Sequence, residues 1–271
     1  MSDVFGNKEN ETNKFITRYL KTTHCDIFFA DALILVEGTA ENMLLPHFIH
    51  NKYPILNQMY ISILEINGRH SHRLRPLIEK IGLTTLIITD IDSVSLEGHH
   101  SHKEPKREEG IITTNYAITN WILELKSLDD LLDLESDRKV KKYNKPSDFF
   151  IRIAYQIPID IQYKNEKIEA IASTFEDSLI YNNFEFFSNE TEKDGVIFKI
   201  QNTIAKCNNF QEIHKNIYEE IRDKNFQKAE FALDLIFSKD PNEIQVPNYI
   251  EEGLEWLEEQ LKKHGKLLEG E

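Results

Sequence analysis

Four acidic side chains occur in two closely spaced pairs that could bind a divalent metal ion. Glu37 and Glu41 stand four residues apart, and Asp90 and Asp92 are separated by one residue. Mg²⁺ and Mn²⁺ prefer oxygen ligands in near-octahedral geometry, which carboxylates supply. Four carboxylates that converge on one place would repel one another without a cation. The residue types therefore predict a metal site, provided that the fold brings the two pairs together.

The segments around these pairs alternate between apolar runs and helical patterns. Residues 32–36 form a continuous apolar run, typical of a strand that is covered on both faces, and 60–66 and 84–89 are also predicted strands. Helices are predicted at 40–50 and 74–81. Strands that alternate with helices indicate an α/β fold, with a mostly parallel sheet flanked by helices.

Both acidic pairs are predicted to lie at the same edge of this sheet. In open parallel sheets, ligand sites form beyond the carboxyl ends of the strands, and Glu37 and Asp90 follow two of the predicted strands. Gly38 is expected to let the backbone turn sharply before Glu41. Side-chain alternation along a strand is expected to place Asp90 and Asp92 on one side. Structural explanations also stay open. Glu41 could be a surface residue in the first turn of a helix, where a negative charge is favourable, and Asp90 and Asp92 could be ordinary turn residues.

Downstream, the pattern changes from a polar loop at 93–110 to strands and then mainly to helices. The helix after the loop is expected to be N-capped by Thr113 or Thr114. The further predicted elements are a helix at 115–126, strands within 149–170, and helices at 227–238 and 249–268. This C-terminal helical part completes the predicted α/β fold.

The composition is that of an ordinary globular protein. Of 271 residues, 40% are hydrophobic and 29% are charged, without an apolar run long enough for a membrane span. The sequence starts without a secretory signal, and Cys25 and Cys207 suit neither a disulfide framework nor a zinc site. A cytoplasmic protein without membrane contact is therefore expected. The net charge of −14 argues against a basic DNA-binding surface, although metal-binding carboxylates account for part of it.

Two stretches resemble the Toprim domain of the OLD (overcoming lysogenization defect) family. The first is 28–41, FFADALILVEGTAE, followed by Leu-Leu-Pro, and the second is 87–94, IITDIDSV. A glutamate combined with D-x-D is the general Toprim signature. The flanking Phe-Phe-Ala and Asp-Ser-Val are similar to the OLD branch, as is the Thr-Asn pair at 114–115 with Trp121. The similarity extends as far as Lys228.

The resemblance implies a Toprim-type fold and a division of the chain into three parts. These are a lead-in at 1–24, a catalytic core at 25–180 and a helical C-terminal subdomain at 181–271. It also implies a DNA endonuclease that hydrolyses phosphodiester bonds with two Mg²⁺ or Mn²⁺ ions, in phage defence or DNA processing.

The same resemblance assigns roles to individual residues. The implied metal ligands are Glu37, Glu41, Asp90, Asp92, Thr174 and Glu176, and the implied catalytic residues are Glu37, Asp90, Asp92 and Lys228. Glu37 could also act as a general base. Lys228 would neutralise charge that builds on the phosphate in the transition state. Without the resemblance, Lys228 would be one of many lysines at a helix start.

A basic cluster follows the predicted second strand, on the same edge as the acids. Arg69, Arg73 and Arg75 are expected to contact DNA phosphates there, and the basic run at 138–145 is a second candidate. An exposed basic helix face would give the same pattern. Both readings stay open for each segment.

The resemblance also implies partners for this chain. OLD enzymes pair the Toprim domain with an ABC-type ATPase. This sequence has no G-x-x-x-x-G-K-[ST] motif, either in residues 1–24 or further along. We therefore expect no ATP binding by this chain. DNA, an ATPase domain or subunit, and a second copy of the chain in a homo-oligomer are the expected partners. An excised C-terminal region and a separate subunit both fit the sequence.

Two other functions remain compatible with the sequence. One is a Toprim-like regulatory or binding subunit that does not cleave, which the negative charge favours. The other is strand passage or primer synthesis, which the lack of a topoisomerase tyrosine context or a primase zinc motif disfavours. Metal-dependent nicking of a plasmid distinguishes the first from a nuclease, and analysis of the products distinguishes the second.

Overall fold

The computed structural model of the protein describes residues 25–66, 71–96, 102–108, 110–164, 166–189, 191–238 and 243–269. For 71–73, 238 and 264–269 it describes the backbone only. The predicted lead-in at 1–24 lies outside the described residues. Within the described part of the chain, no helix combines the length and apolar character that a membrane span requires.

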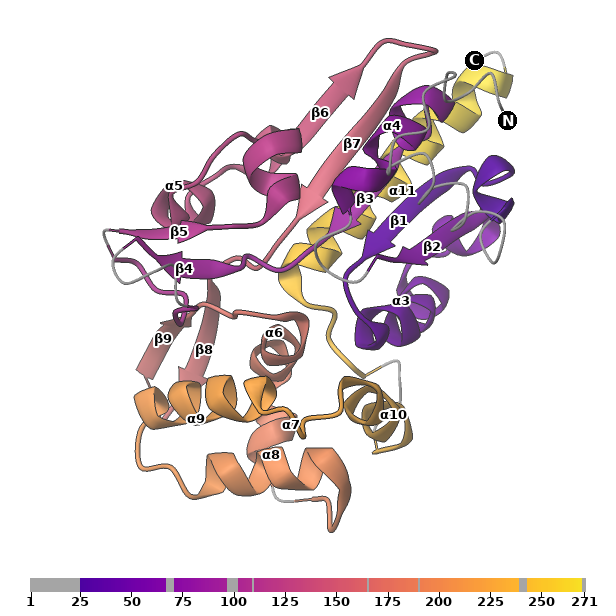
Figure 1. Ribbon diagram of the computed structural model, residues 1–271. Helices are drawn as coiled ribbons and strands as arrows, with labels where there is room; N and C mark the ends of the chain where they lie inside the picture. The colour runs from indigo at the N-terminus through magenta and orange to yellow at the C-terminus, as the bar shows by residue number, and fades with distance from the viewer. Residues whose placement is uncertain are drawn as a thin grey trace.

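A five-stranded sheet forms the centre of the molecule, with helices on both faces and beyond one edge (Figure 1). In chain order the elements are η1 (Cys25–Phe28), β1 (Ala32–Val36), α3 (Thr39–Lys52), η2 (Leu56–Gln58), β2 (Ile61–Glu65), α4 (Ser71–Ile81), β3 (Thr85–Ile88), β4 (Ser93–Ser95), β5 (Ile111–Thr113), η3 (Ala117–Ile122), α5 (Leu128–Leu132), η4 (Ser136–Lys139), β6 (Val140–Tyr143), β7 (Phe149–Ala154), β8 (Ile159–Tyr163), β9 (Glu166–Ala170), α6 (Phe175–Asn182), α7 (Phe184–Ser188), α8 (Gly195–Ala205), α9 (Phe210–Arg222), α10 (Lys228–Ser238) and α11 (Asn248–Glu269). The predicted α/β class is confirmed.

The sheet is mostly parallel, with the strand order β2-β1-β3-β7-β6. β1 pairs in parallel with β2 and β3, and β3 pairs in parallel with β7, whereas β6 runs antiparallel to β7. Along β1, Ala32, Ile34 and Val36 enter one hydrophobic core, and Leu33 and Leu35 enter the other. Burial on both faces therefore explains why this strand is a continuous apolar run.

Two sets of helices cover the two faces of the sheet. Side chains of α3 and α11 pack into one core, and side chains of α4, η3 and α5 pack into the other. The C-terminal helix α11 lies along β3 and β7. It approaches the sheet closely because residue 253 is glycine: a Cβ there would lie 2.9 Å from a methyl carbon of Leu86. The helix predicted at 249–268 thus serves to cover the sheet.

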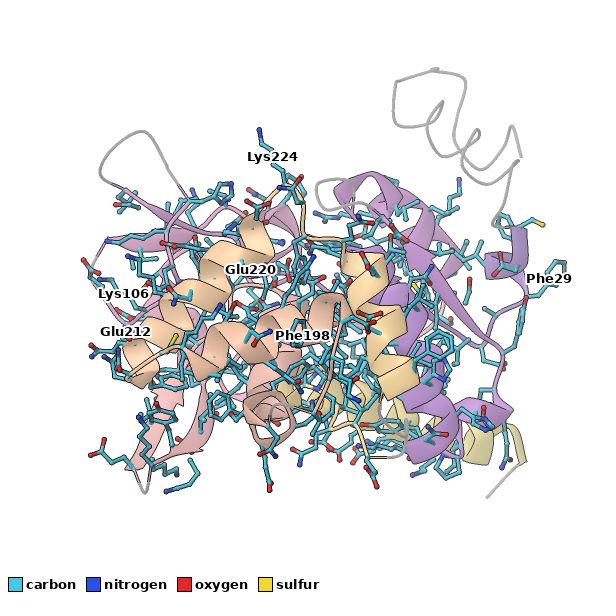
Figure 2. All side chains as sticks on the ribbon, turned by 90° about the horizontal axis from the view of Figure 1, so that it is seen from below. Phe29, Lys106, Phe198, Glu212, Glu220 and Lys224 are labelled. Atoms are coloured by element: carbon cyan, nitrogen blue, oxygen red, sulfur yellow. The ribbon has the colours of Figure 1, made fainter. Side chains whose placement is uncertain are left out.

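The helices from α6 to α10 form a layer beyond the carboxyl ends of the parallel strands (Figure 1). Within this layer α8 packs against α7, α9 and α10, and α10 also packs against α3. Seen from below, Glu212, Glu220 and Lys224 lie on its outer surface (Figure 2). The boundary expected at residue 180 falls inside α6, and it stays a prediction. The layer faces the sheet edge at which the acidic pairs were expected.

The helix predicted at 115–126 differs from the observed structure in length and type. Ala117–Ile122 form η3, a π-helix. The first two N–H groups of η3 donate to the side-chain oxygen of Asn115 at 2.9 and 3.3 Å. The expected caps were therefore wrong, because Thr113 lies in β5 and Thr114 does not contact these groups. π-Helices occur frequently at functional sites.

Gly195 is required where α8 begins. Its φ is +82°, and a Cβ at this position would overlap the carboxylate of Asp234 in α10. That carboxylate accepts a hydrogen bond from the backbone of Val196 at 2.6 Å. We expect Gly195→Ala to lower the free energy of unfolding by about 1–3 kcal/mol, because it adds left-handed strain and displaces Asp234.

Urea unfolding measures this loss, and Gly110→Ala is a matched control. Gly110 also has a positive φ, +84°, but nothing lies within 4 Å of the position of its Cβ. The control should lose less stability, because it carries the strain without the overlap. Equal losses in the two variants would show that the contact between α8 and α10 does not matter for stability.

Candidate active site

Glu37 and Glu41 lie in the predicted turn between β1 and α3. Glu41 is 2% exposed and lies in the first turn of α3. Gly38 is the N-cap, with φ −135° and ψ 173°, an extended conformation that any residue can adopt. The chain does bend at Glu37 and Gly38, as predicted, but the bend does not require a conformation special to glycine. The lack of a side chain at this position instead leaves room for Glu41, because a Cβ on Gly38 would lie 2.9 Å from Glu41 Oε2.

Asp90 and Asp92 lie just beyond β3, which ends at Ile88. Asp92 has φ +47°, in the left-handed region. The alternation of an extended strand therefore does not describe this pair, contrary to the prediction. The side chain of Asp90 accepts a hydrogen bond from Gln156 Nε2 at 2.7 Å, whereas the backbone carbonyl of Asp92 accepts one from Thr114 at 3.2 Å. The D-x-D loop is thus fixed from two neighbouring segments.

Asn115 connects the two acid-bearing loops to each other. Its Nδ2 donates to Glu37 Oε1 at 3.2 Å, to Thr89 Oγ1 at 2.6 Å and to the Asp90 carbonyl at 3.0 Å. Thr89 Oγ1 also donates to Glu37 Oε1. Sequence analysis singled out Asn115 only within the family resemblance. The preference of Asn for helix caps was a usable signal, because the same side chain caps η3.

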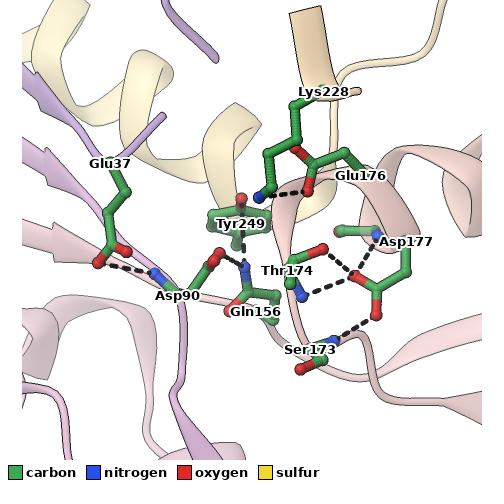
Figure 3. A network of polar contacts seen from close by, with 10 residues as sticks. Glu37, Asp90, Gln156, Ser173, Thr174, Glu176, Asp177, Lys228 and Tyr249 are labelled. Carbon is green, nitrogen blue, oxygen red and sulfur yellow. Dashed lines mark hydrogen bonds and ion pairs between the residues drawn. The ribbon is translucent and has the colours of Figure 1, made fainter. Parts of the chain in front are cut away.

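Thr174 and Glu176 lie at the start of α6. Glu176 is fully buried. Thr174 is the N-cap, and its hydroxyl donates to Asp177 Oδ1 at 3.1 Å. Asp177 also accepts hydrogen bonds from the backbone N–H groups of Ser173 and Thr174, both at 2.7 Å (Figure 3). Asp177 thus forms a capping box with Thr174, a role that the Thr-x-x-Asp spacing could have indicated.

Lys228 opens α10 and points toward these acids. Its Nζ lies 3.0 Å from Glu176 Oε2 (Figure 3). Burial alone would lower the pKa of Lys228, but the negative charges of Glu176, Asp90 and Glu41 raise it above its usual value. The fold therefore places the lysine together with acids from three separate segments of the chain. The sequence motif around Lys228 could not predict this placement without the family resemblance.

Burial and mutual repulsion raise the pKa values of the clustered carboxyl groups. Burial raises the pKa of Glu37 to about 7, where hydrogen bonding from Thr89 opposes the shift and the charge of Asp92 adds to it. Burial and the neighbouring Glu176 raise the pKa of Glu41 to about 8. The pKa of Asp90 is also raised well above its usual value by burial and by Glu37. A bound cation would favour the charged forms of all of these groups.

The donor chemistry fits a hard divalent cation, but the carboxylates do not form a finished metal cage. Glu41 Oε2 and Glu176 Oε1 are buried oxygen atoms without a hydrogen-bond partner, a costly state that a cation would relieve. Among the described residues, however, no three His, Cys, Asp or Glu side chains are placed so that together they could hold one ion. Side-chain rearrangement would therefore have to accompany metal binding.

The structure gives only partial information on the predicted DNA-contacting arginines. Arg69 and the side chain of Arg73 lie outside the described residues. Arg75 in α4 donates to Glu79 at 2.8 Å and to the carbonyl of Asn120 in η3 at 3.3 Å. In this structure Arg75 therefore links α4 to η3. A contact between these arginines and DNA stays a prediction.

The basic run at 138–145 is largely engaged within the fold. Lys139 is 3% exposed. Lys141 donates to the carbonyl of Trp121 at 2.8 Å, and Lys142 pairs with Asp148 at 2.7 Å. These contacts give three lysines structural roles and weaken the second candidate for DNA binding.

The segment that carries both predicted acidic pairs matches a known family. Residues 28–92 match the family model of the overcoming lysogenization defect protein-like TOPRIM domain. This segment is therefore similar to the OLD-like Toprim domain. The resemblance inferred from the sequence is thereby confirmed. The Toprim segment contains the acids that follow β1 and β3, whereas the positions in α6 and α10 lie beyond it.

Known proteins are similar to the chain well beyond the Toprim segment. Endonuclease GajA from Bacillus cereus (strain HuB5-5) is 27% identical over 273 residues, an alignment that covers 96% of this chain and 36% of GajA. The C-terminal region of the Burkholderia pseudomallei OLD protein has a TM-score of 0.47 at 18% identity, covering 86% of this chain and 99% of that one. The C-terminal region of the Xanthomonas campestris pv. campestris OLD protein has a TM-score of 0.43 at 18% identity, covering 89% and 98%. The chain thus spans about a third of the length of GajA.

His214 of α9 links the helical layer to the segment that precedes α6. Its Nε2 lies 3.1 Å from the carbonyl oxygen of Ile171, and its Nδ1 contacts Glu104. Burial alone would lower the pKa of His214, but the hydrogen bond and charge of Glu104 raise it above its usual value. The hydrogen bond from His214 in turn lowers the pKa of Glu104.

We expect this ion pair to stabilise the protein most in mildly acidic solution. Because folding raises the pKa of His214, its contribution is complete below the ordinary value of 6.5 and is lost as the pH rises through the folded value. Because folding lowers the pKa of Glu104, its contribution is present above 4.5 and is lost as the pH falls. Urea unfolding of the wild type and His214→Gln should therefore differ more at about pH 5.5 than at about pH 8.5. The same difference at both pH values would contradict the assignment.

Proposed function

We propose that this chain is the nuclease part of an OLD-like enzyme, which hydrolyses phosphodiester bonds in DNA with divalent metal ions. The observation that carries the proposal is the meeting of buried carboxylates with unpartnered oxygens, Glu41 and Glu176, and a lysine at the edge of the Toprim sheet. The similarity to endonuclease GajA supports the same reaction class. Neither a buried charge cluster nor orphaned oxygens would be expected of a purely structural surface.

Six side chains would hold two Mg²⁺ or Mn²⁺ ions in this proposal: Glu37, Glu41, Asp90, Asp92, Thr174 and Glu176. When bound, such ions activate water and stabilise the charge on the attacking and leaving oxygens. Thr174 would have to exchange its hydrogen bond to Asp177 for a metal contact. Glu176 could contact a metal ion through Oε1, which has no partner, and release of Lys228 from Oε2 would be a separate step.

Two residues would contribute directly to proton transfer and charge stabilisation. Glu37 accepts hydrogen bonds from Thr89, Asn115 and the backbone N–H of Asp90, which hold its carboxylate beside the D-x-D loop, where it could act as a general base. Lys228 keeps its positive charge, because the surrounding carboxylates raise its pKa. Once released from Glu176, its ammonium could stabilise the negative charge on the phosphate. These roles assign proton transfer to Glu37 and charge stabilisation to Lys228.

The partner side of the proposal is an ABC-type ATPase, either on the same polypeptide or as a subunit, and a homo-oligomer that presents more than one nuclease site to DNA. The chain covers 36% of GajA, so a protein of that length has room for a further domain. Arg69, Arg73 and Arg75 remain the proposed contacts to DNA phosphates.

A Toprim-like binding subunit that does not cleave is the second candidate. The observations that favour it are the net charge of −14 and the lack of a finished three-ligand metal site among the described side chains. The negative charge would weaken DNA binding relative to a basic nuclease surface. The missing three-ligand site would weaken metal binding relative to a preformed one. In this case the acidic cluster would serve docking or regulation.

Cleavage of supercoiled plasmid with Mg²⁺, Mn²⁺ or EDTA tests the two candidates. The nuclease requires nicked or linear product with metal and none with EDTA. If an intact chain gives no product with either metal, the assay is repeated with an ATPase partner. Absence of cleavage in both assays would sink the nuclease and leave the binding subunit.

A further inference from the structure

A second buried amide, besides that of Asn115, holds the D-x-D loop. Gln156 lies two residues beyond the end of β7 and is fully buried. Its Nε2 donates to Asp90 Oδ1 at 2.7 Å, and its Oε1 accepts from the backbone N–H of Ile91 at 2.8 Å. One amide thus contacts both a side chain and the backbone of the same loop. An amide suits this place because it supplies a donor and an acceptor and carries no charge at any working pH.

A second contact orients this amide. Gln156 Nε2 also lies 3.5 Å from the hydroxyl of Tyr249, a 2%-exposed residue in the first turn of α11 (Figure 3). The Tyr249 ring stands between Asp90 on one side and the Glu176–Lys228 pair on the other (Figure 3). Tyr249 of α11 is therefore connected to Asp90 through Gln156, which contacts both residues.

We propose that Gln156 is a positioning residue for Asp90, and that Tyr249 supports it from α11. The inference rests on the proposed function, because it concerns how the chain presents a metal-binding carboxylate. The donated hydrogen bond fixes one Asp90 oxygen and leaves the other oriented for a cation. Side chains that hydrogen-bond to metal ligands commonly change metal affinity by about 10- to 100-fold when they are removed.

The other contacts of Asp90 do not replace this one. Asn115 contacts the backbone carbonyl of Asp90 and not its carboxylate. Glu37 Oε1 accepts a hydrogen bond from the backbone N–H of Asp90 at 3.2 Å, whereas its effect on the Asp90 carboxylate, like that of Lys228, is electrostatic. Gln156 is thus the hydrogen-bond donor that selects the orientation of the Asp90 side chain within the described structure.

Binding of Mn²⁺ to the metal-free chain, followed by electron paramagnetic resonance of the free ion, tests the proposal without cleavage. Gln156→Met removes both hydrogen bonds of the amide and should weaken Mn²⁺ binding by about 10- to 100-fold. Tyr249→Phe should show a smaller loss, about two- to tenfold.

The matched control is Gln201→Met. Gln201 in α8 is also buried, at 1% exposure, and its amide makes hydrogen bonds to Thr191, Glu192 and Phe186. Its replacement should cost stability as Gln156→Met does, but it should leave Mn²⁺ affinity as in the wild type. The Tyr249→Phe variant removes a single oxygen atom and keeps the test available if Gln156→Met does not fold.

The outcomes separate this inference from the proposed function. If the wild type does not bind Mn²⁺, the proposed metal site itself fails. If the wild type binds Mn²⁺ and Gln156→Met binds it equally well, the donated hydrogen bond is not needed and the positioning role is overturned. A loss in Gln156→Met that Gln201→Met reproduces would overturn it too, because the loss would then reflect stability alone.

Discussion

Asp90→Asn is expected to reduce metal-dependent DNA cleavage by at least about 10³-fold, because in the proposed site it would remove a charged ligand whose ion would stabilise the transition state by several kcal/mol. The asparagine keeps an oxygen that can accept the hydrogen bond from Gln156. The loop should therefore retain its conformation, and the loss should reflect the missing charge. Initial rates of plasmid nicking under saturating Mg²⁺ measure the effect.

The stability of the same variant should change in the opposite direction. Burial and Glu37 raise the pKa of Asp90, which means that its charge costs stability in the metal-free fold. Metal-free Asp90→Asn should therefore unfold at a higher temperature than the wild type, whereas Mg²⁺ should stabilise it less. Asp160→Asn is the control, because Asp160 is exposed and pairs with Lys167 on the small β8–β9 sheet. Unchanged nicking by Asp90→Asn would exclude Asp90 from the reaction.

Lys228→Met is expected to lower the turnover number by about 10²- to 10³-fold, the range seen when one group that stabilises transition-state charge is removed. Mn²⁺ binding should remain, because the lysine is not a ligand in the proposed site. Without metal, the variant should also be less stable, since Glu176 is fully buried and would lose the partner 3.0 Å away. Saturating Mg²⁺ should reduce that loss of stability.

Lys224→Met provides the comparison for Lys228→Met. Lys224 lies on the outer surface of the helical layer, four residues before α10 (Figure 2). Its replacement removes the same charge from the same region without touching the acids. Equal turnover in the Lys228 and Lys224 variants would show that Lys228 acts only through the overall charge of the chain, and the proposed role would be withdrawn.

The sheet and its main helices could be predicted because their sequence patterns are local. The apolar run of β1 and the amphipathic pattern of α11 reflect burial that each element carries in its own residues. The π-helix η3 could not be predicted in this way. Its start depends on Asn115, whose side chain also reaches Glu37, 78 positions away in the chain. The periodic pattern of apolar residues in the sequence gives no information about such a contact.

The candidate site likewise contains residues that local sequence patterns predict and residues that these patterns do not predict. Glu37, Glu41, Asp90 and Asp92 follow strands, so the rule for parallel sheets was enough to bring them to one edge. Lys228 is on a helix 52 residues beyond Glu176, and only the resemblance to the OLD family related the two. Gln156, a single polar residue after an apolar strand, has no motif around it. Its role follows from three-dimensional contacts alone.

The position of α11 across β3 and β7 has a consequence for synthesis on the ribosome. Ile250, Leu254, Leu257 and Leu261 fill the same core as the inner residues of β1 and β3. The part of that face which α11 covers, next to α3, therefore stays uncovered until the helix is made. β7 is synthesised about a hundred residues before α11, and β3 and β1 about 160 and 210 residues before it, at roughly 5–20 residues per second. The nascent chain therefore carries an exposed apolar part of the sheet for several seconds, and packing of this core is completed only after α11 has been translated. During this interval a chaperone that binds the nascent sheet would protect it from aggregation.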